Sequence, residues 1–450
     1  MALKTIGAAA TLGIAGCVSD PPKSSNPPES SGLSQSNQSA VEQTPTGETE
    51  PSPQWPMAAH DTRGSGYNPV AKIQEPPQQE WQISLPIENH PTECIIDTKQ
   101  VYYVEHLHNQ LPPGTKLKAR RLTDGSLEWS KRLPNQELAP PAIGQGPNGQ
   151  QTIFVPSSYD EKSTGLVQGS VFAIDPASGD ELWMKALGTE IGGLTVAGNS
   201  VVVTTTAEDS TAVHVLNATT GTERFSKPSN KLQHVPTVYD GAIYFSTSRE
   251  SLAAVSWVDG TQQWETSTRA DDTRPVVDQY RDFVYMGHRR GLEAFDRTTG
   301  KQVWNHTVTP ADTPNDKWLG VQDEPVVMEN QLVVRTQDTS SNNVDDIGHC
   351  YGINPQTGKK TWELPEGHPG SSIVGAGDHV LLRRGDSAST MEIGQITKTS
   401  EGAAGLVAVD TEGSISWEQR GQWRPIAVSK SGLIGYKMSQ DKYYISYFSI

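Results

Sequence analysis

Cysteine is scarce in this 450-residue chain: only Cys17, Cys94 and Cys350 are present, and no two of them are adjacent. This low count excludes a small domain held together by disulfides. Basic residues are also few, since 36 Lys and Arg stand against 52 Asp and Glu, giving a net charge of −16 at pH 7. We therefore expect no binding of nucleic acid or of an anionic membrane surface through the body of the protein.

Helical periodicity is missing as well. Apolar residues make up 34% of the chain and do not recur with the 3.6-residue period of amphipathic helices. They form short runs instead, such as 201–203, 242–245 and 283–286, which predict β-strands. The sequence also has no Gly-x-Ser-x-Gly elbow, His-Glu-x-x-His pair, phosphate loop or EF-hand loop. These absences argue against several common classes of enzyme and metal site.

The sequence repeats a β-hairpin, and the best-preserved copy is Val171–Trp183. Alternating apolar residues lead to Asp175, a turn ends at Gly179, and Trp183 follows on the next strand. We expect the Asp175 carboxylate to accept backbone N–H groups of the turn and Gly179 to adopt a positive φ. Because one hairpin cannot cover the ring of Trp183, a neighbouring copy has to bury it.

Seven copies of the hairpin follow one another, and in each the aromatic residue lies four positions after the glycine. The aromatic residues recur every 39 to 58 positions, and the shortest interval is about the length of a four-stranded propeller blade. The predicted anchors are Trp129, Trp183, Phe225, Trp264, Trp304, Trp362 and Trp417. The predicted turn residues are Asp175, Gly179, Gly221, Gly260, Asp296, Gly300, Gly358, Asp410 and Gly413.

This pattern of Ala, Asp, Thr-Gly and Trp resembles the repeat of β-propellers of the pyrroloquinoline-quinone (PQQ) type, whose anchors are called tryptophan-docking motifs. The resemblance extends from Trp55 to Ile450. The family includes quinoprotein dehydrogenases, the outer-membrane assembly lipoprotein BamB and many cell-surface proteins. The resemblance therefore implies a fold but not one function.

Residues 55–450 are predicted to form an all-β, eight-bladed propeller of four-stranded antiparallel blades. The strand Gln79–Leu85 carries Trp81 but has no hairpin of its own, whereas only three strands follow Trp417. We expect this N-terminal strand to close the last blade, with Trp81 as an eighth anchor.

The N-terminal residues 1–17 resemble a targeting segment, because Lys4 precedes a run of small and apolar residues that ends at Cys17. Ile14-Ala-Gly-Cys17 resembles a lipobox, which implies a lipid on Cys17 and an extracytoplasmic protein anchored to the cell membrane. An ordinary secretory signal with an incidental cysteine is the alternative. Residues 18–54, rich in Ser, Pro, Gln and Thr, predict a flexible tether.

By resemblance, a quinoprotein dehydrogenase would need a vicinal disulfide, a calcium ion held by carboxylate and amide oxygens, and an Asp base. Cys94 and Cys350 are predicted in blades one and six, so we expect two buried thiols rather than a disulfide. His106-Leu-His108 has a spacing that suits zinc or copper but lacks a third ligand, and His288-Arg289-Arg290 is a small basic cluster at an expected hairpin. A structural role is the simpler explanation for both, and we expect no catalytic, cofactor-binding or metal site.

Two insertions, Thr336–Gly348 in blade six and Gly385–Gly405 in blade seven, are candidate partner-binding loops. Asn37, Asn217 and Asn305 begin Asn-x-Ser/Thr sequences, which can accept glycans. The leading hypothesis is a monomeric, membrane-anchored scaffold that binds other envelope or surface proteins without catalysis. The alternatives are a redox enzyme with PQQ or another cofactor in the central funnel, and a carbohydrate-binding module. The missing catalytic residues favour the scaffold.

Overall fold

The computed structural model describes residues 54–450, apart from 87–90, 92–93, 108–113, 134–138, 162–165, 189, 207–210, 230–234, 248–250, 270–272, 289–290, 308–318, 322–323, 339–348, 365–368, 385–390, 393–394, 397–404, 422 and 439–441. The predictions for residues 1–53, including lipidation of Cys17 and the flexible tether, lie outside these described residues. Across the part that is described, no helix is long and apolar enough to cross a membrane.

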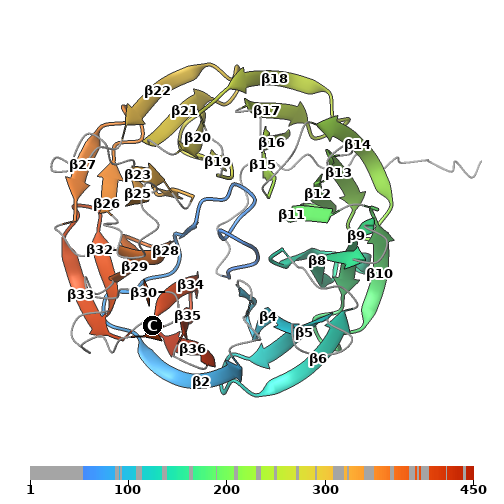
Figure 1. Cartoon of the computed structure of the whole chain (residues 1–450), viewed down its shortest axis with the longest axis horizontal. Coiled ribbons are helices and arrows are strands. Elements are labelled where there is room, and N and C mark those ends of the chain that lie inside the picture. The colour runs from blue at the N-terminus through green and yellow to red at the C-terminus, as the bar shows by residue number, and fades with distance from the viewer. Residues whose placement is uncertain are drawn as a thin grey trace, which may run out of the picture. The chain divides into compact units, whose positions relative to one another are not determined.

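Eight antiparallel sheets surround a central axis, and successive strands of each sheet step outward from it (Figure 1). The predicted eight-bladed propeller is thereby confirmed. Blades 1 and 2 consist of β3 (Ile95–Ile96), β4 (Gln100–Leu107), β5 (Gly114–Arg121) and β6 (Leu127–Leu133), then β7 (Ala142–Gln145), β8 (Gln151–Glu161), β9 (Leu166–Ile174) and β10 (Glu181–Ala186). Blades 3 and 4 consist of β11 (Glu190–Ala197), β12 (Ser200–Thr206), β13 (Thr211–Asn217) and β14 (Glu223–Ser229), then β15 (Thr237–Tyr239), β16 (Ala242–Thr247), β17 (Ser251–Ser256) and β18 (Gln262–Ser267).

The remaining blades continue the same order around the ring. Blades 5 and 6 consist of β19 (Val276–Val277), β20 (Phe283–His288), β21 (Gly291–Asp296) and β22 (Gln302–Thr307), then β23 (Leu319–Val321), β24 (Val326–Val327), β25 (Leu332–Asp338), β26 (His349–Ile353) and β27 (Lys360–Glu363). Blades 7 and 8 consist of β28 (Pro369–Ala376), β29 (His379–Arg384), β32 (Gly405–Asp410) and β33 (Ile415–Arg420), then β34 (Arg424–Ser429), β35 (Gly432–Met438), β36 (Lys442–Ser449) and β2 (Gln78–Pro86). A short helix, η1 (Pro147–Gly149), lies between β7 and β8.

The last blade joins the two ends of the ring, as predicted. β2 pairs antiparallel with β36, and Trp81 lies opposite Tyr447 in this pairing. The N-terminal strand is thus the outermost strand of blade 8, although more than 350 residues separate it from its partner. Its alternating burial, with Trp81 and Leu85 inside, explains why the strand docks in only one register.

The core lies between neighbouring blades rather than in one central mass. The middle strands are buried on both faces, as in β12 and β16, whereas the outer strands, such as β10 and β22, expose alternate residues. This pattern follows from the architecture, because the two middle strands of a blade are covered by blades on both sides.

Two boundaries differ from the sequence prediction. β25 continues to Asp338, so the first three residues of the predicted blade-six insertion, Thr336–Asp338, are strand residues that pair with β23. In the blade-seven insertion, β30 (Met391–Glu392) and β31 (Gln395–Ile396) form a two-stranded ladder. The other residues of both insertions lie largely outside the described part of the chain.

Candidate functional site

The repeat anchors lie between neighbouring blades. Trp183 contacts Phe154 of its own blade, with ring centroids 5.8 Å apart, and its indole N–H donates to the Ala218 carbonyl of blade 3 at 2.9 Å. Five other tryptophans make the same kind of bond to the next blade, at 2.7 to 3.0 Å: Trp81, Trp129, Trp264, Trp304 and Trp362. Phe225 has no N–H and packs on Gly260 instead.

The turn glycine of each hairpin receives the aromatic ring of the preceding blade. Gly179 has a φ of +76°, and a Cβ built on it would lie 2.8 Å from the ring of Trp129. Gly125, Gly221, Gly260, Gly300, Gly358 and Gly413 have the same geometry. The glycine is therefore required twice, once for its positive φ and once for the close approach of the ring.

The repeated Asp and Asn residues hold the turns. Oδ1 of Asp175 accepts the backbone N–H groups of Ala177 and Ser178, at 2.7 and 3.0 Å. Asp296 accepts the equivalent pair in blade 5, whereas Asp410 accepts N–H groups two and four residues later, since its hairpin is one residue shorter. These carboxylates are occupied by local structure.

The centre of the ring holds the segment that precedes β2. We call residues 54–73 the axial segment, and it is the blue trace inside the ring in Figure 1. Its backbone bonds to the innermost strands in ring order, beginning with Trp55 against Ile96 of blade 1 and Pro56 against Ile143 of blade 2. The carbonyls of Thr62, Arg63, Ser65 and Gly66 then accept N–H groups from blades 4, 5, 6 and 7, at 2.7 to 3.0 Å.

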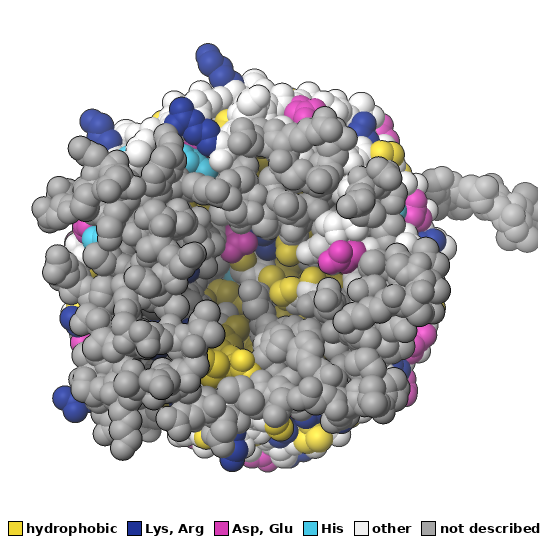
Figure 2. Space-filling view, in the orientation of Figure 1, with side chains coloured by type: hydrophobic (Ala, Val, Ile, Leu, Met, Phe, Trp, Pro, Cys, Tyr) yellow, Lys and Arg dark blue, Asp and Glu magenta, His cyan; other side chains and the backbone are white. Residues whose placement is uncertain are grey.

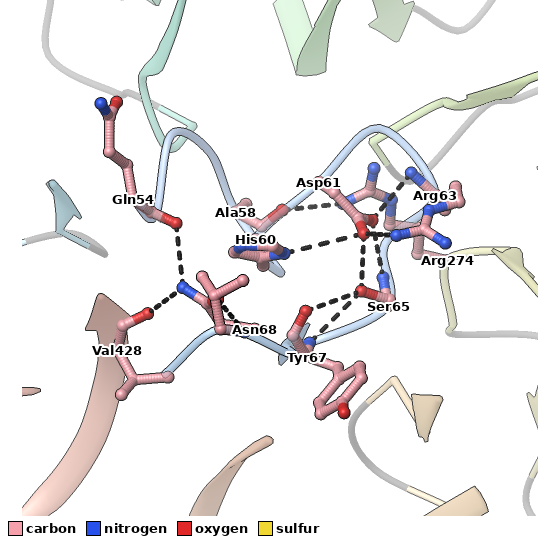
Figure 3. Close-up of polar contacts among 11 residues, drawn as sticks. Gln54, Ala58, His60, Asp61, Arg63, Ser65, Tyr67, Asn68, Arg274 and Val428 are labelled. Atoms are coloured by element: carbon pink, nitrogen blue, oxygen red, sulfur yellow. Dashed lines mark hydrogen bonds and ion pairs between the residues drawn. The ribbon is translucent and has the colours of Figure 1, made fainter. Parts of the chain in front are cut away.

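Side chains of the axial segment complete this series of contacts around the ring, which we call the axial circuit. Met57 packs in the hydrophobic cluster shared by blades 2 and 3. β1 (Tyr67–Asn68) pairs in parallel with β28 of blade 7, and the Asn68 amide donates to the Val428 carbonyl of blade 8 at 2.9 Å. The same amide donates to the carbonyl of Gln54 at 3.2 Å, which ties the end of the circuit to its beginning (Figure 3). The axial segment thus contacts all eight blades.

Asp61 is the polar centre of the axial segment (Figure 3). Its carboxylate accepts the Arg63 guanidinium at 2.5 Å, the Ser65 hydroxyl at 2.7 Å and the backbone N–H groups of both residues. Burial alone would raise the pKa of Asp61, but the charge of Arg63, the neighbouring His60 and the Ser65 N–H hold it well below its ordinary value. The Asp61 carboxylate is therefore charged at neutral pH, and its hydrogen bonds fix a tight bend.

Arg274 of blade 5 joins the axial segment to the ring, and its side chain is only 2% exposed. The guanidinium donates to the Ala58 carbonyl at 3.1 Å and to the hydroxyls of Thr237 and Thr195, at 3.1 and 3.3 Å. Gly64 packs against it, because a Cβ there would lie 3.0 Å from Nε. One arginine thus connects blades 3, 4 and 5 with the segment on the axis.

The axial segment closes one end of the axis. The strand residues that bond to it, such as Val238 and Val277, are followed directly by the turns to the second strands, so the segment lies at the turn side of the ring. Figure 2 shows the molecule in the orientation of Figure 1, with a hollow at the centre in which hydrophobic side chains are visible.

His60, Asp61 and Ser65 have the residue types of a hydrolytic triad but not its geometry. Ser65 donates directly to Asp61, is 2% exposed, and the His60 Nδ1 lies 3.7 Å from the same carboxylate oxygen. A triad needs the histidine between the serine and the acid. The arrangement stabilises a bend and does not activate a nucleophile.

The described residues do not fit the quinone site that the family resemblance suggests. Cys94 and Cys350 are buried in separate clusters and form no disulfide. No group of three or more His, Cys, Asp or Glu residues converges within the described ranges. Buried carboxylates have structural partners instead, since Glu105 pairs with Lys118 and Glu293 accepts bonds from Thr268 and the Arg269 N–H.

The weaker sequence candidates remain separate. His106 is in β4, whereas His108 lies outside the described residues, so the predicted histidine pair stays untested. His288 ends β20 and is 2% exposed, so it belongs to the strand rather than to the hairpin loop expected for His288-Arg289-Arg290.

A second repeat escaped the sequence analysis. A proline directly precedes or opens the innermost strand of several blades, and its carbonyl accepts a hydroxyl from the preceding blade: Thr195 donates to Pro236 and Thr237 to Pro275, each at 2.5 Å, and Ser372 donates to Pro425. The sequence signal for this repeat is a Pro shortly before or at the start of a short apolar run.

Comparison with known proteins gives a family match for part of the chain. Residues 167–341 match the model described as "Outer membrane protein assembly factor BamB". A 1-butanol dehydrogenase (quinone) of Thauera butanivorans is 31% identical over 149 residues, which are 30% of this chain and 23% of that protein. The quinoprotein alcohol dehydrogenase PedH of Pseudomonas putida is 28% identical over 149 residues, 31% of this chain and 24% of that protein. Less than a quarter of each relative's length is matched.

Solved structures share the architecture. The quinohemoprotein alcohol dehydrogenase ADHIIG from Pseudomonas putida HK5 has a TM-score of 0.62 at 12% identity and covers 88% of this chain and 80% of that chain. BamB from Moraxella catarrhalis has a TM-score of 0.55 at 12% identity and covers 83% of this chain and 100% of that chain. At this identity the likeness concerns the fold alone. The likeness to these structures shows an eight-bladed β-propeller fold, and the match to the BamB model over residues 167–341 supports the resemblance seen in the repeats.

Proposed function

We propose that this protein is a monomeric, membrane-anchored extracytoplasmic propeller that binds other envelope or surface proteins and catalyses no reaction. The observation that supports this most is the axial segment, which uses the centre of the ring for structure. The charged groups that hold it, Asp61 in the segment and Arg274 in blade 5, are engaged by several bonds each.

The anchoring part of the proposal rests on the lipobox-like sequence before Cys17. Cys17→Ser should release the full chain from membranes into the soluble extracytoplasmic fraction, while the propeller unfolds at an unchanged temperature. Fractionation and thermal unfolding of the same preparation measure both. Native protein with an intact, unmodified Met1 would contradict the anchoring proposal.

The binding part is tested by affinity capture of the lipidated protein from its native membrane after mild cross-linking. We expect the same envelope or surface proteins in repeated preparations and their loss when deletion of residues 55–85 disrupts the propeller. Capture of nothing beyond a control membrane protein would contradict the scaffold function.

A second function, quinone-dependent alcohol oxidation, is favoured by one observation: both curated relatives are named as quinone or quinoprotein dehydrogenases. When bound, PQQ with calcium would supply a polarised quinone that accepts electrons. We predict no dye-linked oxidation of alcohols or sugars by residues 18–450 reconstituted with PQQ and calcium, and no saturable quinone binding in calorimetry. Turnover that chelation abolishes would replace the scaffold proposal with the enzyme.

A further inference from the structure

Two of the three Asn-x-Ser/Thr sequences lie in the described part of the chain, and they differ in exposure and in hydrogen bonding. Asn217-Ala-Thr219 forms a hairpin turn of blade 3, and Asn305-His-Thr307 ends the outermost strand of blade 5. Asn37-Gln-Ser39 lies outside the described residues.

The Asn305 sequence is open to solvent. β22 pairs only with β21, so its outer edge carries no further strand. Alternation along the strand places Val303, Asn305 and Thr307 on one face, and all three are exposed, whereas Trp304 and His306 are half-buried. Neither the Asn305 amide nor the Thr307 hydroxyl has a hydrogen-bond partner among the described residues.

Polar groups of the Asn217 sequence are engaged in hydrogen bonds at the hairpin turn. Oδ1 of Asn217 accepts the N–H groups of Thr219 and Thr220, at 2.9 and 3.0 Å. The Thr219 hydroxyl, which a glycosylating enzyme has to recognise, donates to Oδ1 of Asn199 at 3.0 Å. In the folded protein this sequence presents neither group in an open form.

We propose that Asn305 is a glycan acceptor and that Asn217 is not. A bond forms between Nδ2 of Asn305 and the anomeric carbon of a glycan carried on a lipid phosphate. The amide loses a proton, the carrier phosphate leaves with the electrons of the broken C–O bond, and no oxidant is needed. The glycan also covers Val303, a valine that is 45% exposed on the same face. The proposal rests on the proposed extracytoplasmic location.

Peptide mass mapping of the full chain purified from its native membrane tests this assignment. The tryptic peptide 302–317 contains no other Asn-x-Ser/Thr sequence. We expect sugar mass on this peptide, its loss in Asn305→Gln and Thr307→Ala, and its retention in the conservative Thr307→Ser and in the matched control Asn217→Gln.

An unmodified 302–317 peptide overturns the proposal. A label that does not cross membranes, applied to intact cells, shows which premise is at fault. If the label reaches the propeller, the acceptor assignment is wrong, whereas an unlabelled propeller means that the proposed location is wrong. Sugar mass on the peptide that contains Asn217 also overturns the distinction between the two sequences.

Discussion

The ring has two kinds of blade junction. At seven junctions an aromatic residue docks on the hairpin turn of the next blade, as Trp183 does on Gly221. At the eighth, between blades 7 and 8, no such hairpin exists, because the third and fourth strands of blade 8, β36 and β2, come from opposite ends of the chain. Trp417 donates instead to the Ile73 carbonyl of the axial segment at 3.3 Å. A docking tryptophan thus needs a carbonyl and a flat surface, not a hairpin.

The largest effect should come from removing the segment that serves the eighth junction. Deleting residues 55–85 removes β2, the Trp81 anchor, the acceptor of Trp417 and the axial circuit, and leaves the edge of β36 unpaired. We expect aggregation and loss of the cooperative unfolding transition, measured by light scattering and thermal unfolding. Deleting residues 1–53 is the control, and unchanged melting of the larger deletion would contradict eight-blade closure.

An ordinary junction should be weakened strongly but locally. Trp183→Ala and Trp304→Ala should each lower the free energy of unfolding by about 3 kcal/mol, since a large ring and its N–H bond are lost. Trp183→Phe should cost only about 1 kcal/mol, the value of one hydrogen bond, because Phe225 already fills this place in blade 3. Denaturant unfolding measures these differences. Equal losses from Trp183→Ala and from the exposed neighbour Leu182→Ala would mean that the register is wrong.

The hairpin glycine that receives the docked ring is required for its positive φ and for the close approach of that ring. Two substitutions should separate these requirements. Gly198→Ala adds a Cβ at a φ of +53° with nothing within 4 Å, so only the backbone cost of about 1 kcal/mol is expected. Gly179→Ala has the same backbone cost and also forces the Trp129 ring away, so its loss of stability should be about twice as large. Equal losses in the two variants would show that the ring moves freely.

Acid should weaken the axial segment before it weakens the docking junctions. The folded state lowers the pKa of Asp61, so its contribution is complete above the unfolded value of about 3.9 and is lost as pH falls toward the lower folded pKa. Asp61→Asn should reduce the free energy of unfolding by on the order of 2 kcal/mol at pH 7 and flatten its decline below pH 5. Denaturant unfolding from pH 7 to 3 measures this, with exposed Asp180→Asn as the control. An unchanged acid slope in Asp61→Asn would contradict the assigned role.

The smallest effect is expected at the least regular hairpin, 118–129. Arg121 is exposed and pairs with Asp124 and Glu128 on the surface. Arg121→Ala should change the free energy of unfolding by less than about 0.5 kcal/mol in the same denaturant assay. A loss comparable to that of Trp183→Ala would mean that this hairpin docks through its charged residues.

The sequence predicted the features that recur from blade to blade and missed the contacts that occur only once in the fold. The Gly-to-aromatic spacing predicted seven blades, because every copy follows the same local pattern. The Trp81 strand, which has no hairpin of its own, and the three strands after Trp417 predicted the eighth blade and its closure. The sequence analysis predicted no role for the axial segment, since its bonds to the ring are made mainly by backbone carbonyls, which carry no sequence signal. Arg274 was missed for a related reason: its partners, Ala58, Thr195 and Thr237, are neutral and distant in sequence.

The axial circuit also has a consequence for the order of folding. Residues 54–73 leave the ribosome before any blade, but some of their partners are among the last to be made: Asn68 bonds to Val428, 360 positions later, and Ile73 to Trp417, 344 positions later. Contacts between residues so far apart in sequence form slowly, because the entropy of closing a long loop is lost before the contact contributes any stabilisation. The start of the axial segment can pair with blades 1 and 2 early, through Trp55 and Pro56, whereas the contacts of Asn68 and Ile73 must wait until nearly the whole chain exists.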